Sequence, residues 1–253
     1  MTRPKLFIRK PSILADPFNA VFYNNRAFAR IKLKHYEDVV EDCIHSLDLS
    51  PKSLKPTYYL SQAHLELGNY EDALSSALQA HALCVANNET KSLGAITQHV
   101  LRCKRERWEQ IEKKRKREDG DLERETLSLM ADAMQRELQD VQDEADRREI
   151  EAEWKAKMER TRAIFDTARA KADKRREVPE WAVDDISFGI MVDPVVTKTG
   201  KSYERAYIME YLQNSKIDPI TREPLMPEDL RPNLQLREAC EEFLNENGWA
   251  VDW

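Results

Sequence analysis

Two stretches of the chain repeat one another at an offset of 34 residues: LKHYEDVVEDCIHSLDL, from Leu33 to Leu49, and LGNYEDALSSALQAHAL, from Leu67 to Leu83. The triplet Tyr-Glu-Asp stands at the same place in both, and apolar residues recur at helical spacing in each stretch. A fixed period in this range, with two helical stretches per unit, is typical of stacked helix pairs. The sequence therefore predicts a helical repeat domain.

This period and pattern resemble the tetratricopeptide repeat. Two helix pairs are expected, with Gly68 ending a helix and Asn69 in the following turn. A further helix, from about Glu89 to Trp108, is predicted to cap the stack. Stacked helix pairs present a groove that binds extended peptides, so we favour peptide binding over a mere scaffold.

The segment 104–177 carries 21 basic and 21 acidic residues with interleaved signs, one glycine and no proline. Its sparse apolar residues approximate a heptad seam at positions 122, 126, 129, 133 and 136–138. Long helices packed as a hairpin or coiled coil are predicted, which implies self-association. A monomeric helix held by surface ion pairs is the alternative.

Composition excludes several classes of function. The net charge is -6 and no glycine-rich phosphate loop is present, so neither a nucleic-acid partner nor a nucleotide cofactor is expected. The four cysteines have no C-x-x-C spacing and lie in helical patterns, which predicts buried free thiols and no metal. No apolar run is long enough for a membrane span. We expect a cytoplasmic or nuclear protein with no cofactor.

A small α+β domain is predicted from Val178 to the C-terminus. Pro194–Thr197 is expected to be a strand, and a return strand begins at Ser202. A helix then runs through Gln213, and a last helix from Leu234 to Asn245 has Asn233 as its N-cap. One cysteine and no histidine occur here, so no Cys/His zinc cage can form.

The stretches ISFGIMVDPVVTKTGKSYER and IDPITREPLMPEDLRPNLQLREACEEFLNENGW resemble the U-box, which is a RING-like domain without metal. With the repeats and the charged middle, about 17–253 resembles the chaperone-associated ubiquitin ligases of the tetratricopeptide/U-box type. The fold class is then mainly α, in four parts: an N-terminal segment 1–18, repeats and capping helix 19–103, a helical hairpin or coiled coil 104–177, and the U-box 178–253.

The resemblance implies a surface that docks a ubiquitin-conjugating enzyme, formed by Ile186, Phe188 and Pro219. Ile186 and Phe188 are two residues apart, so in an extended loop they would face the same way; both could instead be core residues. Arg222 matches a cationic residue that positions ubiquitin on the conjugating enzyme, and an intradomain salt bridge is the alternative. Asp193, Asp218, Thr221 and Arg222 are expected to give the loops polar support in place of zinc.

The resemblance also implies a carboxylate clamp for the C-terminal tail of heat-shock chaperones, carried here by Asn25 and Lys55. An earlier repeat that supplies a further lysine and asparagine has no counterpart before Pro17. The family's aspartate in the capping helix is replaced near Gly94 and Ala95. Either the chain is shortened relative to its relatives, or chaperone binding is weakened or changed.

The implied function is that of a ubiquitin ligase that ubiquitinates chaperone-bound or misfolded clients. Its partners would be a conjugating enzyme, ubiquitin, a chaperone tail and a second copy in a homodimer. Ubiquitin would pass from the conjugating enzyme to a substrate lysine with no covalent ubiquitin on the ligase. The alternative is a non-catalytic adaptor that scaffolds and dimerises.

Overall fold

The computed structural model describes residues 16–139, 141–172 and 177–252, so the predicted N-terminal segment lies largely outside the described residues. The chain divides into two compact units. One unit combines residues up to Glu109 with those from Val178 onward, and the other comprises Gln110–Glu177. The described part is mainly helical, as predicted.

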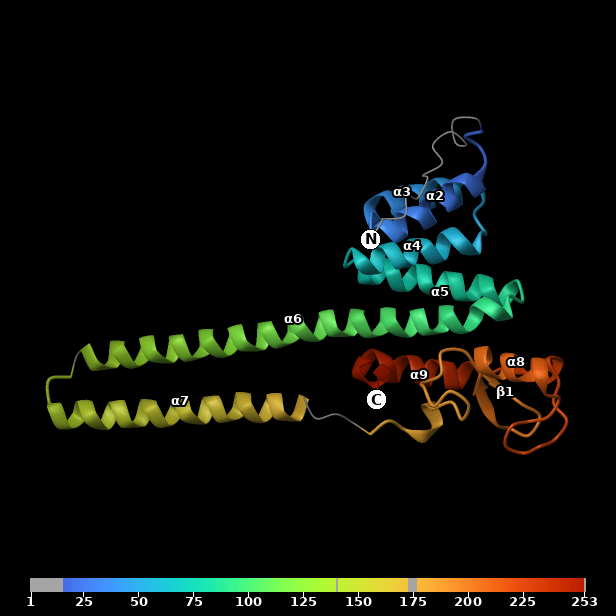
Figure 1. The fold of residues 1–253 in the computed structure, drawn as a ribbon. Helices are drawn as coiled ribbons and strands as arrows, with labels where there is room; N and C mark the ends of the chain where they lie inside the picture. Colours follow the sequence, from blue (N-terminus) through green and yellow to red (C-terminus); the bar gives the residue numbers. More distant parts are fainter. Residues whose placement is uncertain (1–15, 140, 173–176, 253) are drawn as a thin grey trace, which may run out of the picture. The chain divides into compact units, whose positions relative to one another are not determined.

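Four antiparallel helices form the repeat stack: α2 (Ala20–Leu33), α3 (Tyr36–Leu49), α4 (Leu54–Glu66) and α5 (Tyr70–Ala86) (Figure 1). These are the two predicted helix pairs. Small residues let the helices approach closely, because Ala27 and Ala63 are fully buried in one cluster with Val39 and Cys43. Gly68 has a φ of 79° and stands just after α4, which confirms the predicted helix end.

The third predicted helix is much longer than expected. Helix α6 runs from Thr90 to Gln139 without a break, whereas the sequence predicted an end near Trp108. Gly120 does not interrupt it, because one glycine costs a helix only about 1 kcal/mol and no proline follows. The first turns of α6 do bury the predicted capping residues Leu93, Ile96, Val100 and Leu101.

The unit 110–177 is a helical hairpin, as predicted, made of the later part of α6 and α7 (Glu144–Ala172). The Trp154 indole donates to Glu137 at 2.7 Å, and the Thr161 hydroxyl lies 3.6 Å from the sulfur of Met130. The predicted seam is only partly right. Leu122 and Leu129 are 56% and 59% exposed, because the intrachain contact uses the neighbouring face of α6.

The C-terminal domain, residues 177–252, contains a small antiparallel sheet of order β2-β1-β3. Its strands are β1 (Pro194–Val196), β2 (Ser202–Glu204) and β3 (Arg231–Pro232), with Val195 opposite Tyr203. Helices α8 (Arg205–Asn214) and α9 (Leu234–Glu246) complete the domain with short 3-10 helices at Glu180–Ala182, Pro227–Asp229 and Gly248–Asp252. Asn233 caps α9 by accepting from the Leu236 amide at 3.1 Å. The predicted strands, helices and cap are confirmed.

All four cysteines are free and buried, as predicted. In the described ranges, no group of His, Cys, Asp and Glu side chains is arranged to bind a metal ion. No described helix combines the length and apolar character needed to cross a bilayer.

Candidate functional site

The first turn of the site, Asp184–Gly189, is built around a buried aspartate. The Asp184 carboxylate accepts from the amide and the hydroxyl of Ser187, both at 2.7 Å. Its backbone closes the turn, since the Asp184 amide donates to the Gly189 carbonyl and the Phe188 amide donates back to Asp184, both at 2.8 Å. These bonds hold Phe188 at a φ of 57°, which is strained for a side chain of that size.

The second turn, Asp218–Glu223, is built around another buried aspartate. The Asp218 carboxylate accepts from the amides of Ile220 and Thr221 at 2.9 and 3.0 Å. The Asp218 amide donates to the Glu223 carbonyl, and the Arg222 amide donates back to Asp218. Arg222 has a φ of 61°. The second turn therefore also holds a large side chain in the left-handed conformation.

Strand β2 connects the two turns through consecutive residues. The Tyr203 hydroxyl donates to Asp218 at 2.7 Å, and the Glu204 amide donates to Asp184 at 2.8 Å. Burial opposes ionisation of Asp218, but its N–H and hydroxyl donors outweigh burial and lower its pKa. The predicted polar support by Asp218 and Thr221 is thus present, and Thr221 contributes through both its backbone amide and its side chain.

Glu204 adds a third buried carboxyl group beneath the turns. One of its oxygens accepts from the amides of Val192 and Asp193 at 2.7 and 2.8 Å, and the other has no partner among the described residues. Burial raises the pKa of Glu204 to about 7. Asp193, another predicted support, pairs with Arg205 at 2.6 Å. Glu204 of β2 and Arg205 at the start of α8 therefore hold Val192 and Asp193, which follow shortly after the first turn.

The turns expose two of the predicted docking residues to different degrees. Phe188 is 74% exposed, whereas Ile186 is half-buried against the apolar cluster around Val195 and Ile208. This segment is not extended, because the hydrogen bonds of Asp184 fold it into a tight turn. Ile186 is therefore partly a core residue, as the alternative holds, whereas Phe188 is not.

The second turn carries the other predicted residues. Pro219 is half-buried and Arg222 is exposed. Within the described residues, the Arg222 side chain makes no hydrogen bond or ion pair, so the salt-bridge alternative is not seen there. Its guanidinium is available to a partner.

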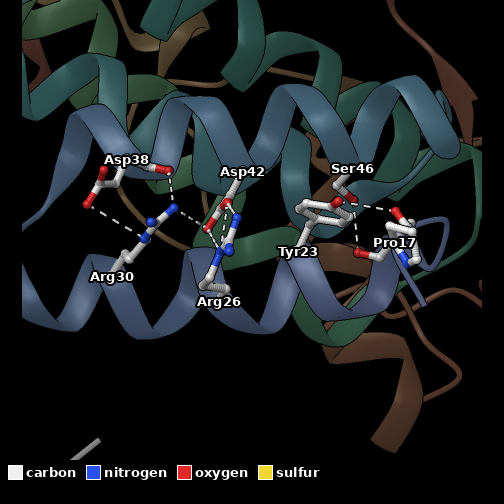
Figure 2. A network of polar contacts seen from close by, with 8 residues as sticks. Pro17, Tyr23, Arg26, Arg30, Asp38, Asp42 and Ser46 are labelled. Carbon is white, nitrogen blue, oxygen red and sulfur yellow. Dashed lines mark hydrogen bonds and ion pairs between the residues drawn. The ribbon is translucent and has the colours of Figure 1, made fainter. Parts of the chain in front are cut away.

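A second candidate site lies on the repeat stack, where a polar network fixes the rotation of α2 (Figure 2). Asp42 of α3 is fully buried and accepts from Arg26 Nε at 2.9 and 3.0 Å. Arg30 pairs with the same carboxylate at 2.7 Å and donates to the Asp38 carbonyl. Ser46 bonds the side chain of Asn24 at 2.7 Å. This side of α2 therefore faces α3.

The other side of α2 is exposed and contains the predicted Asn25 together with Phe28 and Lys32, at helical spacing. Phe28 lies 5.8 Å from the ring of Tyr59 on α4, and the Lys32 ammonium lies 5.3 Å over the Phe28 ring. The predicted Lys55 is exposed, one turn before Tyr59. The result is a basic and aromatic face across α2 and α4.

Sequence reasoning missed Phe28, Lys32 and Tyr59. Phe28 and Lys32 lie three and seven residues after Asn25, and Tyr59 lies four residues after Lys55. This helical spacing was the signal that could have identified them. Within the described residues the side chains of Asn25 and Lys55 make no hydrogen bond or ion pair. The face can therefore offer two ammonium groups and an amide to a carboxylate ligand.

Comparison with known proteins identifies the C-terminal domain and relates most of the chain to a ubiquitin ligase. The U-box domain family matches residues 178–249. The E3 ubiquitin-protein ligase CHIP of Arabidopsis thaliana is 31% identical over 241 residues, which cover 94% of this chain and 86% of that protein. The Hsp70/Hsp90 co-chaperone CNS1 of Saccharomyces cerevisiae is 32% identical over 111 residues, covering 44% of this chain and 28% of that protein. A solved complex of the TPR2B domain of yeast Sti1 aligns with 36% of this chain and 73% of its own, at a TM-score of 0.35 and 24% identity.

Proposed function

The chain belongs to the family of the E3 ubiquitin-protein ligase CHIP, and we propose that its two U-box turns dock a ubiquitin-charged conjugating enzyme. The chain is a U-box ubiquitin ligase, related over most of its length to that enzyme. The observation that carries the docking proposal is the exposure of Phe188 and Arg222 at the left-handed positions of two rigid turns. Strained conformations of this kind persist where the surrounding structure fixes them, and they cluster at functional sites.

Docking would use Phe188 as the anchor, with Ile186 and Pro219 beside it. A phenyl ring that is 74% exposed on a small domain is unfavourable in water, and its burial by a partner would release that cost. The hydrogen bonds of Asp184 hold the ring in place before the partner arrives, so little conformational entropy is lost on binding.

Arg222 would act on the conjugate after docking. Its five donors can bridge carbonyl groups of ubiquitin and of the conjugating enzyme, which restricts a flexible thioester to a reactive geometry. The absence of a protein partner for its side chain among the described residues leaves all five donors available. Arg222 is therefore the residue that we assign to ubiquitin positioning.

We expect no covalent ubiquitin on the ligase itself. A thioester intermediate needs a reactive thiolate, and all four cysteines are buried. Burial raises the pKa of Cys43 and Cys240 to about 12 and that of Cys84 and Cys103 to about 11. Ubiquitin would pass directly to the substrate lysine. Free thiols of this kind suit a reducing compartment such as the cytoplasm or the nucleus.

The test is discharge of a ubiquitin-charged conjugating enzyme to free lysine, followed over time on non-reducing gels. Arg222→Ala should slow discharge roughly tenfold or more, since hydrogen bonds from a charged donor contribute about 1.5–3 kcal/mol. Arg231→Ala is the matched control, because Arg231 is also exposed but lies on β3. An Arg222→Ala protein that discharges at the wild-type rate would contradict the assigned role.

The basic and aromatic face of the repeat stack would bind the acidic C-terminal tail of a heat-shock chaperone. Lys55 and Lys32 offer charge, Asn25 offers a directed donor, and Phe28 and Tyr59 offer an apolar surface between them. Chaperone-bound or misfolded clients would then be the substrates.

Lys55→Ala tests this face through the affinity of a fluorescent chaperone-tail peptide, measured by anisotropy. Lys52→Ala is the matched control, since Lys52 is exposed in the loop before α4. Loss of affinity in Lys55→Ala alone would support the face. Equal affinity in both variants would show that the tail binds elsewhere.

Self-association would use the helical hairpin 110–177. Leu122 and Leu129 are more than half exposed, and Ile164 is 69% exposed, so each would be covered by a second copy. Sedimentation of Leu129→Glu should show a shift from dimer to monomer. An unchanged dimer would exclude this surface.

A further inference from the structure

A cleft of about 580 Å³ lies beside helix α5 and is lined by residues of both the repeat stack and the U-box. These residues belong to the same compact unit of the chain. The volume falls within the range of small-molecule sites, which is roughly 300–1,000 Å³. Neither the docking turns nor the basic and aromatic face of α2 and α4 contributes to the cleft. None of the functions proposed above therefore uses it.

The walls of the cleft are mainly apolar. Leu78 and Val85 of α5 form one wall, and Met191 and Leu244 of the U-box belong to the other. A hydrocarbon chain or an aromatic ring would leave water on entering this space, which favours its binding. The cleft therefore suits a ligand with an apolar body.

One buried polar atom of the cleft has no partner. His81 of α5 is 7% exposed, and its Nε2 makes no hydrogen bond among the described residues. Burial lowers the pKa of His81, so the imidazole is neutral near pH 7. A neutral imidazole that carries its proton on Nε2 can donate it to a ligand oxygen. A buried ring nitrogen without a partner costs free energy, and such a ligand would remove that cost.

The charged residues that line the cleft leave one basic group over, since three are basic and two are acidic. Lys104 pairs with Glu241 at 3.6 Å. Arg205 and Arg237 share one carboxylate, that of Asp193, at 2.6 and 3.9 Å. Within the described residues the Arg237 guanidinium makes no hydrogen bond, so its donors are available to a further acid group.

We propose that this cleft binds a small amphipathic carboxylate, such as a medium-chain fatty acid. Its carboxylate would accept from the Arg237 guanidinium and from His81 Nε2, and its chain would lie against Leu78, Val85 and Met191. The charge of Arg237 acts on the pKa of His81, which places both donors in one part of the cleft. The inference is independent of conjugating-enzyme docking and of chaperone-tail binding.

Octanoate and octanamide are the probes, because they share one apolar chain and differ in charge. Calorimetry with the full chain should show octanoate binding roughly tenfold more tightly, since hydrogen bonds to charged groups are the stronger ones. Octanoate should also shift the ring-nitrogen magnetic resonance of His81, which is assigned by its loss in His81→Gln. Equal affinity for the two probes would overturn the carboxylate class. Absence of octanoate binding, or an unmoved His81 resonance, would overturn the site.

Arg237→Gln tests the charge. The variant should lose roughly tenfold in octanoate affinity and keep its octanamide affinity, because glutamine is similar in polarity but carries no charge. Arg231→Gln is the matched control, since Arg231 is exposed on β3 and does not line the cleft. Wild-type octanoate affinity in Arg237→Gln would overturn the assigned role of Arg237.

Ala82→Trp tests the place of binding, because Ala82 lines the cleft and an indole there would occupy the space. It should abolish binding of both probes. Gln79→Trp is the control, at an exposed position of α5 that does not line the cleft, and it should bind as the wild type does. Thermal unfolding of each variant reports the fold. Wild-type octanoate affinity in Ala82→Trp would show that the acid binds elsewhere, as on the face around Lys55, and would overturn the proposal.

Discussion

The repeat stack and the U-box each bury carboxylates, but they neutralise them in different ways. In the repeat stack, Asp42 is held by the guanidinium groups of Arg26 and Arg30. In the U-box, Asp184 and Asp218 accept mainly from backbone amides and hydroxyl groups of their own turns and of β2. The first arrangement joins two helices, whereas the second fixes the path of a loop.

This difference follows from what each region must present. A helix already sets the direction of Asn25 and Phe28 by its periodicity, so the ion pair has only to fix the rotation of α2 against α3. A loop has no such periodicity. The U-box therefore uses each carboxylate as an acceptor for several amides, which determines φ at Phe188 and Arg222. Four substitutions can break or sharpen this contrast.

Asp42→Ala should have the largest effect. It leaves the partly buried guanidinium of Arg26 without its carboxylate and leaves Arg30 with Asp38 alone, and breaking such a buried pair costs about 3–5 kcal/mol. The first helix pair should unfold at lower urea concentration while the affinity for conjugating enzyme is unchanged. Glu41→Ala, at the exposed neighbouring position, should be nearly neutral. A wild-type urea midpoint for Asp42→Ala would mean that helix packing alone orients α2.

Asp184→Ala should be the next largest. It removes the acceptor for two amides and a hydroxyl; the unsatisfied buried amide of Glu204 costs about 1–3 kcal/mol, and the half-buried donors of Ser187 add less. Asp184→Asn keeps one acceptor oxygen and should retain part of the stability and of the conjugating-enzyme affinity. Asp185→Ala is the control, because Asp185 is exposed. If Asp184→Ala binds as tightly as the wild type, the first turn does not need its carboxylate.

Glu204 should make the stability of the U-box depend on pH. Its folded-state pKa of about 7 lies above the ordinary value of 4.5, so the folded state binds this proton more tightly. Protonated Glu204 therefore stabilises the folded state fully below about pH 4.5, and this stabilisation is lost as the pH rises through about 7. The charged groups that face Glu204 are Asp184 and Asp193, with the thiol of Cys240 nearby.

Glu204→Gln should remove this decline, on the order of 3 kcal/mol, because the pKa rises from 4.5 to about 7 and one pKa unit corresponds to about 1.4 kcal/mol. Urea unfolding of the variant and the wild type across this pH range gives the difference. Glu210→Gln, an exposed change on α8, should leave the decline in place. Parallel pH profiles for the wild type and Glu204→Gln would be incompatible with a titrating Glu204.

Tyr203→Phe should have the smallest effect, about 1 kcal/mol, since one hydrogen bond is lost and the two amide bonds of Asp218 remain. Discharge should slow more than docking weakens, because the second turn carries Arg222 and the first carries Phe188. The two measurements are the affinity for uncharged enzyme and the discharge rate. If Tyr203→Phe loses affinity for the uncharged enzyme but discharges ubiquitin at the wild-type rate, the assignment of docking to the first turn and of discharge to the second is wrong.

Much of the fold was predictable from local signals. The repeat of Tyr-Glu-Asp at 34 residues located the helix pairs, and Asn233 marked the start of α9. The end of the capping helix was not predictable, because nothing in the sequence near Trp108 distinguishes a helix that stops from one that continues to Gln139. The shape of the segment around Ile186 also needed the structure, since Asp184 receives a hydrogen bond from Glu204, twenty residues away.

By itself, the sequence determined the helix pairs, the charged hairpin, the small sheet and the absence of a Cys/His cage in the U-box, because spacing and composition act locally. Only the tertiary structure determined that two separate segments adopt the same turn and that β2 joins them. The physical reason is that a buried carboxylate accepts hydrogen bonds from the donors that lie near it in space, whatever their separation along the chain.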